Sequence, residues 1–180
     1  MSKWVYKNSG DNSCRFLLGE MGKRNLVCVG LNPSTAEPGD KNLDPTMRRV
    51  RSRALDLGYD GYLMANLYPQ RATDPSDMHR AEDLDRGAVE ENYATIAELF
   101  ALDSFDVWAA WGAAIEGRSY LKAQLLAICD IFQNRSGDAG ARWLHAGELT
   151  KGGHPRHPLY IAQAAPMHEF DVCAYALNLK

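Results

Sequence analysis

The stretch LVCVGLNPSTA, residues 26–36, joins a short apolar run to a loop of small and polar residues. An apolar run of this length that stops at a glycine is typical of a strand buried on both faces, as in a parallel sheet. Similar runs predict three more strands, over residues 61–65, 106–111 and 143–146. Segments with helical periodicity lie between the strands, so the sequence predicts βαβ units and an α/β fold.

The helices between these strands begin at recognisable signals. Asp44 can cap a helix whose first position is Pro45, and Gly58 can end that helix. Asp74-Pro75 opens a second helical stretch. Apolar residues at helical spacing predict the remainder of that stretch and two later helices, over residues 89–100, 121–132 and a final segment ending near 179.

The residues before the first strand predict an N-terminal β-hairpin. Residues 4–6 and 15–18 flank a turn at Gly10-Asp11-Asn12. Without an internal repeat or a linker, residues 1–180 are expected to form a single domain. The predicted architecture is a three-layer α/β/α sandwich with a mainly parallel four-stranded central sheet, plus the N-terminal hairpin.

The composition is that of an ordinary globular protein, with 46% hydrophobic and 24% charged residues. It excludes fibrous and wholly disordered proteins. The net charge of −3 argues against a protein that grips nucleic acid through its overall charge. No apolar run is long enough to span a bilayer, and the chain starts without a signal-peptide core. The four cysteines form no CxxC pair, so we expect a reduced, cytoplasmic protein without membrane contact, metal or cofactor.

Ligands of open α/β sheets bind beyond the carboxyl ends of the strands. Four predicted loops leave those ends, and together they are rich in Asn, His, Arg and Pro. We therefore expect the substrate-binding residues to share one rim of the sheet. They are Gly30, Leu31, Pro33, Ser34, Asn66, Arg71, Thr73, Trp111, Pro158 and Tyr160.

The motifs in these loops resemble two known families. In chain order, GLNPSTA, LDPTMRR, NLYPQRATDP, a Trp-Gly pair and PRHPLY resemble a bacterial and phage family of proteins of unknown function, DUF1643. This resemblance covers nearly the whole chain and implies no chemistry. More distantly, the layout resembles the uracil-DNA glycosylase superfamily. In that superfamily a Gly-x-Asn-Pro or similar loop follows the first strand, an asparagine ends a middle strand, and a His-Pro loop follows the last strand.

The second resemblance implies catalytic roles for Asn32 and His157. Asn32 would orient a water molecule through its side-chain carbonyl, and His157 would hydrogen-bond a carbonyl oxygen of the departing base. Asn66 would read a base edge, because its amide offers both a donor and an acceptor. His154-Pro155 is a competing alignment for the histidine motif. Asparagine cannot act as a general base, so the resemblance supports the scaffold more strongly than it supports glycosylase activity.

Most of these residues also have a structural interpretation. Asn32 can close the turn after its strand, and Asn66 can satisfy loop backbone at a strand end. His157 can be a loop histidine braced by Pro158. Arg71 can pair with a nearby carboxylate such as Asp74 instead of binding a phosphate. Trp111-Gly112 can pack the end of the third strand, and Asp44 fits a helix cap better than a catalytic acid.

Basic residues near these loops offer possible phosphate contacts, namely Arg48, Arg49, Arg51 and Arg156. The leading hypothesis is a protein that recognises a nucleobase in DNA or in a nucleotide, with N-glycosidic hydrolysis as its candidate reaction. One alternative is a non-catalytic module that binds nucleic acid or nucleotide on the same scaffold. Another is an enzyme that acts on free nucleotides, which fits the acidic net charge better than duplex binding does.

Overall fold

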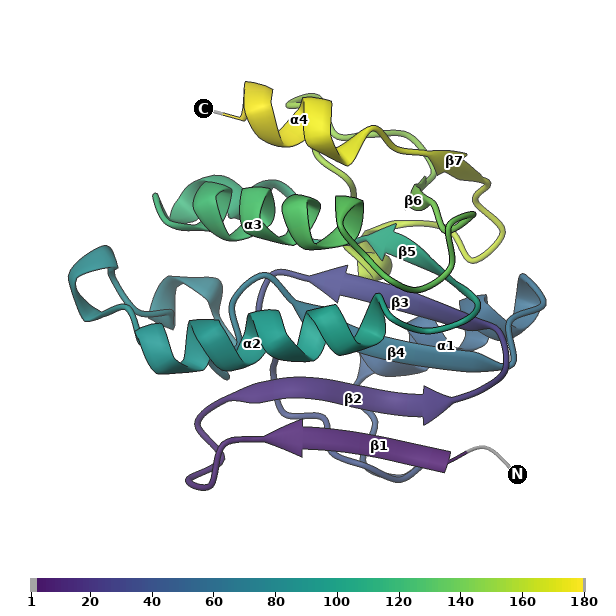
Figure 1. The fold of residues 1–180 in the computed structure, drawn as a ribbon, viewed down its shortest axis with the longest axis horizontal. Coiled ribbons are helices and arrows are strands. Elements are labelled where there is room, and N and C mark those ends of the chain that lie inside the picture. The colour runs from purple at the N-terminus through teal and green to yellow at the C-terminus, as the bar shows by residue number, and fades with distance from the viewer. Residues whose placement is uncertain (1–2, 180) are drawn as a thin grey trace.

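A seven-stranded sheet runs through the computed structural model, which describes residues 3–179 (Figure 1). The strand order is β1-β2-β4-β3-β5-β6-β7. The strands are β1 (Lys3–Asn8), β2 (Arg15–Met21), β3 (Asn25–Gly30), β4 (Gly61–Asn66), β5 (Phe105–Ala109), β6 (Trp143–Ala146) and β7 (Met167–Glu169). The four strands predicted from apolar runs are β3 to β6, and they form the parallel centre of the sheet.

The prediction of a four-stranded sheet is wrong, because three antiparallel strands extend the parallel centre. The predicted hairpin is confirmed as β1 and β2, but β2 also pairs with β4, so the hairpin is part of the sheet. On the other edge, β7 pairs with β6. Strand β7 spans only three residues and has no buried apolar run, which explains why the sequence pattern did not reveal it.

The helices are α1 (Pro45–Asp56), α2 (Arg86–Leu99), α3 (Leu121–Gln133) and α4 (Val172–Asn178). The predicted cap of α1 is confirmed, since Asp44 Oδ1 accepts the Met47 N–H at 2.8 Å. Gly58 follows the helix with φ +81°, a backbone conformation that favours glycine. The continuous helical stretch expected from Asp74 is wrong. Asp74 caps only a single 3₁₀ turn, and α2 begins later, at its own cap Asp85.

Helices cover both faces of the sheet, with α1 on one face and α2, α3 and α4 on the other (Figure 1). Alternate residues of each central strand enter the two cores, because successive strand side chains point to opposite faces. In β3, Cys28 packs with α1, while Val27 and Val29 pack on the opposite side. Among the described residues, no helix is both long and apolar enough to cross a membrane.

Arg53 on α1 is a structural residue, although it is close in sequence to the possible phosphate contacts Arg48, Arg49 and Arg51. Its side chain is 1% exposed and lies 5.6 Å from the centre of the Trp108 ring. The guanidinium donates to the backbone carbonyls of Gln163 and Ala165. Arg53 therefore ties the segment before β7 to α1.

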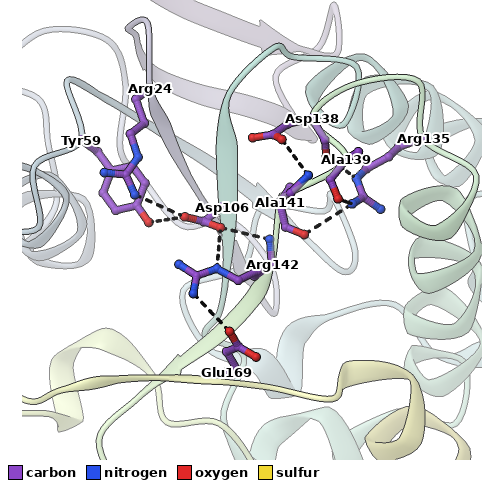
Figure 2. Close-up of polar contacts among 10 residues, drawn as sticks. Arg24, Tyr59, Asp106, Arg135, Asp138, Ala139, Ala141, Arg142 and Glu169 are labelled. Carbon is purple, nitrogen blue, oxygen red and sulfur yellow. Dashed lines mark hydrogen bonds and ion pairs between the residues drawn. The ribbon is translucent and has the colours of Figure 1, made fainter.

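Asp106 lies near the start of β5 and anchors the end of the sheet where the parallel strands begin (Figure 2). Its buried carboxylate accepts the Tyr59 hydroxyl at 2.6 Å and the Arg142 backbone N–H at 3.0 Å. The guanidinium groups of Arg24 and Arg142 each lie 3.6 Å from it. Burial and this carboxylate both raise the pKa of Tyr59. Because both carboxylate oxygens have partners within the protein, Asp106 has a structural role at this end of the sheet.

Candidate functional site

A cavity of about 770 Å³ lies where β3 and β5 end. The loops after β3, β4, β5 and β6 all contribute to its wall, together with the start of α1 and Arg15 of β2. This is the rim on which the sequence placed a ligand. Of the predicted site residues, the wall contains Gly30, Leu31, Asn32, Ser34, Thr73, Trp111, Arg156, His157 and Tyr160.

Asn32 connects two of these loops. Its Nδ2 donates to the Ala72 carbonyl at 2.8 Å and to the Pro33 carbonyl at 3.1 Å. The amide nitrogen therefore holds the loop after β3 against the loop after β4. These bonds leave Oδ1 as the acceptor that Asn32 can offer to a ligand or a water molecule.

His157 has a defined tautomer. The Leu159 N–H donates to His157 Nδ1 at 3.3 Å, so in the neutral ring the proton lies on Nε2. Burial lowers the pKa of His157, and the nearby Asp44 carboxylate only partly opposes this effect. At neutral pH the ring is therefore neutral and offers an Nε2–H donor.

His154, the competing histidine, lies outside the cavity wall. It is 3% exposed, with Nδ1 at 2.8 Å from the Tyr175 hydroxyl and Nε2 at 3.3 Å from Glu116 Oε1. Both ring nitrogens are thus engaged by α4 and by the segment after β5. Of the two histidines in the last loop, His157 is the one that lines the cavity.

A family model described as "Protein of unknown function (DUF1643)" matches residues 15–159. The chain belongs to the DUF1643 family. No curated protein and no solved structure matches it significantly. The matched region of the DUF1643 chain runs from the first residue of β2 to the 3₁₀ turn after His157, and so includes every segment of the cavity wall except Tyr160.

Asn66 of the DUF1643 chain lies beside the cavity and not on its wall. The side chain is 1% exposed, and neither Oδ1 nor Nδ2 has a hydrogen-bond partner among residues 3–179. It lies behind Gly30, the residue it pairs with in β3. A Cβ on Gly30 would come within 2.7 Å of Met64 Cε and 2.8 Å of Asn66 Oδ1, so a larger residue at position 30 would have to displace these side chains.

Replacing Asn66 by leucine should stabilise the fold. The change removes two buried polar atoms without partners, and each such group typically costs about 1–3 kcal/mol. We expect the free energy of unfolding, measured by urea denaturation, to rise by about 1 kcal/mol once some repacking beside Gly30 is allowed for. A decrease would mean that the amide has partners, such as water, that stabilise it in the folded state.

Several other predicted residues act as braces in the DUF1643 fold. Arg71 donates to the Ser34 carbonyl at 2.7 Å and to the Tyr6 hydroxyl at 2.6 Å, so it pairs neither with Asp74 nor with the cavity. Pro33 is buried under the wall, where its carbonyl accepts the Asn32 amide. Pro158 follows His157 as the first residue of a 3₁₀ turn.

Trp111 packs the end of β5, as one interpretation predicted, and both Trp111 and Gly112 line the cavity. Trp111 is 1% exposed and donates from Nε1 to the Tyr175 hydroxyl at 3.2 Å. Gly112 has φ +71° and donates its N–H to the Pro155 carbonyl at 2.9 Å. The pair therefore seats the loop that carries His157.

The arginines of α1 do not line the cavity. Arg51 forms an ion pair with Asp40 at 2.7 Å, and Arg49 donates to Gln163 at 3.1 Å. Arg48 is exposed. Arg156 is the predicted phosphate contact that does lie on the wall, and its Nε donates to the Glu148 carbonyl at 2.8 Å.

Sequence reasoning missed one charged group of the wall, Arg15. For Asp44 the sequence favoured a helix cap over a catalytic acid, and Asp44 does cap α1 while also lining the cavity. Arg15 had no local signal, since it starts a hairpin strand whose pairing with β4 is a long-range contact. Asp44 is the only carboxylate among the described residues that line the cavity.

Proposed function

We propose that this DUF1643 protein binds a nucleobase in the cavity and hydrolyses the N-glycosidic bond of a nucleotide. The observation that carries the proposal is the neutral His157 ring, whose Nε2–H donor belongs to the same cavity wall as Asn32. A distant relationship to the uracil-DNA glycosylase superfamily, with its three-layer α/β/α scaffold, is part of this proposal. Helices on both sheet faces and four free cysteines fit such a scaffold and a cytoplasmic setting.

The reaction requires stabilisation of the departing base and activation of the attacking water, and the wall offers side chains for both. As the C–N bond breaks, its electron pair passes to the base, and the negative charge spreads onto a base carbonyl oxygen. The His157 Nε2–H can donate to that oxygen, a form of stabilisation that grows with the charge. Asn32 Oδ1 can orient the attacking water. Asp44 supplies a carboxylate that can accept the proton of that water as the new C–O bond forms.

The dimensions of the cavity fit a small ligand. Its volume of about 770 Å³ lies in the usual range for small-molecule sites, about 300–1,000 Å³. Leu31, Met47 and Met64 supply apolar wall, which suits the flat face of a base. Tyr160 is 76% exposed at the rim and offers a ring that can stack on a base from outside.

The observations favour a free nucleotide over DNA as the substrate. Two of the three α1 arginines predicted to contact phosphates are already bonded within the protein, and the net charge is −3. If these arginines contacted duplex DNA, the logarithm of the binding constant would fall with the logarithm of the salt concentration by a slope of about −0.9 per phosphate contact. We expect little duplex affinity, and the double variant Arg49→Ala/Arg51→Ala should leave nucleotide binding unchanged.

A non-catalytic binding module is the second candidate. The observation that favours it is the amide of Asn32, whose nitrogen is committed to bracing two loops, as in a purely structural role. Both candidates keep the same cavity and the same ligand class. They differ in whether a bond is broken.

The deciding experiment is a single-turnover screen for base release, with equilibrium binding measured on the same samples. The substrates are nucleotides and oligonucleotides that contain ordinary, deaminated or modified bases. Base release from at least one substrate is the expected result. Binding without release would support the non-catalytic binding module. The absence of both binding and release would refute both candidates.

A further inference from the structure

The guanidinium of Arg15 is the strongest unexplained group on the cavity wall. Arg15 is 2% exposed, and its Nη1 donates to the Ala36 carbonyl at 2.9 Å. Its Nε is buried without a hydrogen-bond partner, and no carboxylate among residues 3–179 forms an ion pair with it. A buried charge without an ion-pair partner is costly, so an anion that enters the cavity would offset this cost.

The charge of the cavity wall is positive on balance. The wall carries two guanidinium groups, Arg15 and Arg156, and the single carboxylate of Asp44. Burial, followed by the proximity of Arg71, lowers the pKa of Arg15 to about 10. Arg15 therefore stays charged at neutral pH, and the nearby second cation is Arg71. The N-terminus of α1 is not the attractor, because Asp44 already caps it.

We propose that Arg15 binds the terminal phosphate of a free nucleotide whose base occupies the same cavity. A planar guanidinium matches phosphate oxygens and can hold two of them at once. The depth of Arg15 selects the kind of phosphate. The free end of a small ligand can reach a buried guanidinium, whereas a phosphodiester within a polymer carries a nucleotide on each side. The base half of this inference rests on the function proposed above, while the phosphate half does not.

The test compares the common nucleoside 5′-monophosphates with their nucleosides by titration calorimetry on the full chain. At least one monophosphate should bind about 10- to 100-fold more tightly than its nucleoside, the range for a charge-assisted bidentate contact. Arg15→Gln should remove this advantage and change nucleoside affinity by less than about threefold.

A second substitution should shift the affinity in the opposite direction. Asp44 is close enough to Arg15 to influence its pKa, so its carboxylate should repel a phosphate bound there. Asn is as good a helix cap as Asp, so Asp44→Asn should keep α1 intact and tighten monophosphate binding. The matched control for Arg15→Gln is Arg48→Gln, which removes the same positive charge at an exposed position on α1 and should have no effect. If Arg15→Gln does not fold, Arg15→Lys can replace it in the test. Lysine keeps the positive charge but lacks the paired donors of the guanidinium, so it should lose part of the monophosphate advantage.

Inorganic phosphate separates the two halves of the inference. If phosphate binds, Arg15→Gln abolishes that binding and no nucleoside binds, then the phosphate site stands and the nucleobase function fails. Equal affinity of the parent protein for nucleoside and monophosphate would overturn the role of Arg15. An equal loss of both ligands in Arg15→Gln, or tighter binding of duplex DNA that is insensitive to Arg15→Gln, would do the same.

Discussion

Replacing His157 by alanine should slow base release by about 10²–10³-fold, the usual effect of losing one donor to a developing negative charge. The structural reason is that Leu159 fixes Nδ1 as an acceptor and leaves the proton on Nε2. Substrate affinity should change much less, because the base carries little negative charge before the bond breaks. Single-turnover rates and equilibrium binding of the same variant provide the measurement.

Variants of the other two polar wall residues act as comparisons. Asn32→Asp places a carboxylate where the water is expected and should retain or raise the rate, whereas Asn32→Ala should lower it. Asp44→Asn should lower the rate if Asp44 accepts the proton, while its cap on α1 persists. If His157→Ala weakened binding and slowed release by the same factor, His157 would contribute ground-state binding and no transition-state stabilisation.

Replacing Arg53 by alanine should reduce the free energy of unfolding by about 3–5 kcal/mol, because two part-buried carbonyls lose their donor and a cavity opens beside Trp108. Urea unfolding of both proteins measures the difference. The effect should be accompanied by loosening of the segment before β7, which hydrogen exchange of its amides would detect.

Arg48→Ala is the matched control, since Arg48 is an exposed arginine on the same helix. Its effect on stability should remain within about 0.5 kcal/mol. Similar small effects for both variants would show that the contacts of Arg53 are replaced by water at little cost.

The central part of the fold could be predicted because its signals are local. Buried parallel strands appear as short apolar runs, and the cap at Asp44 and the stop at Gly58 are single-residue signals. The outer strands could not be predicted as part of the sheet. The pairing of β2 with β4 and of β6 with β7 depends on contacts between distant segments.

The candidate site was predictable to the level of its loops but not of its side chains. The rim was foreseen because the carboxyl ends of parallel strands meet at one edge. Whether a polar side chain faces the cavity depends on partners elsewhere in the chain. Arg71 turns to Tyr6, and Asn66 lies behind Gly30, whereas Arg15 comes from a segment that predicted only a hairpin.

Arg15 lies on β2, outside the parallel strands whose loops build most of the cavity wall. The wall from β3 to β6 is built by loops of consecutive βαβ units, but the buried cation enters from an antiparallel strand outside them. A change in the hairpin could therefore alter the charge preference of the cavity while the parallel centre keeps its sequence.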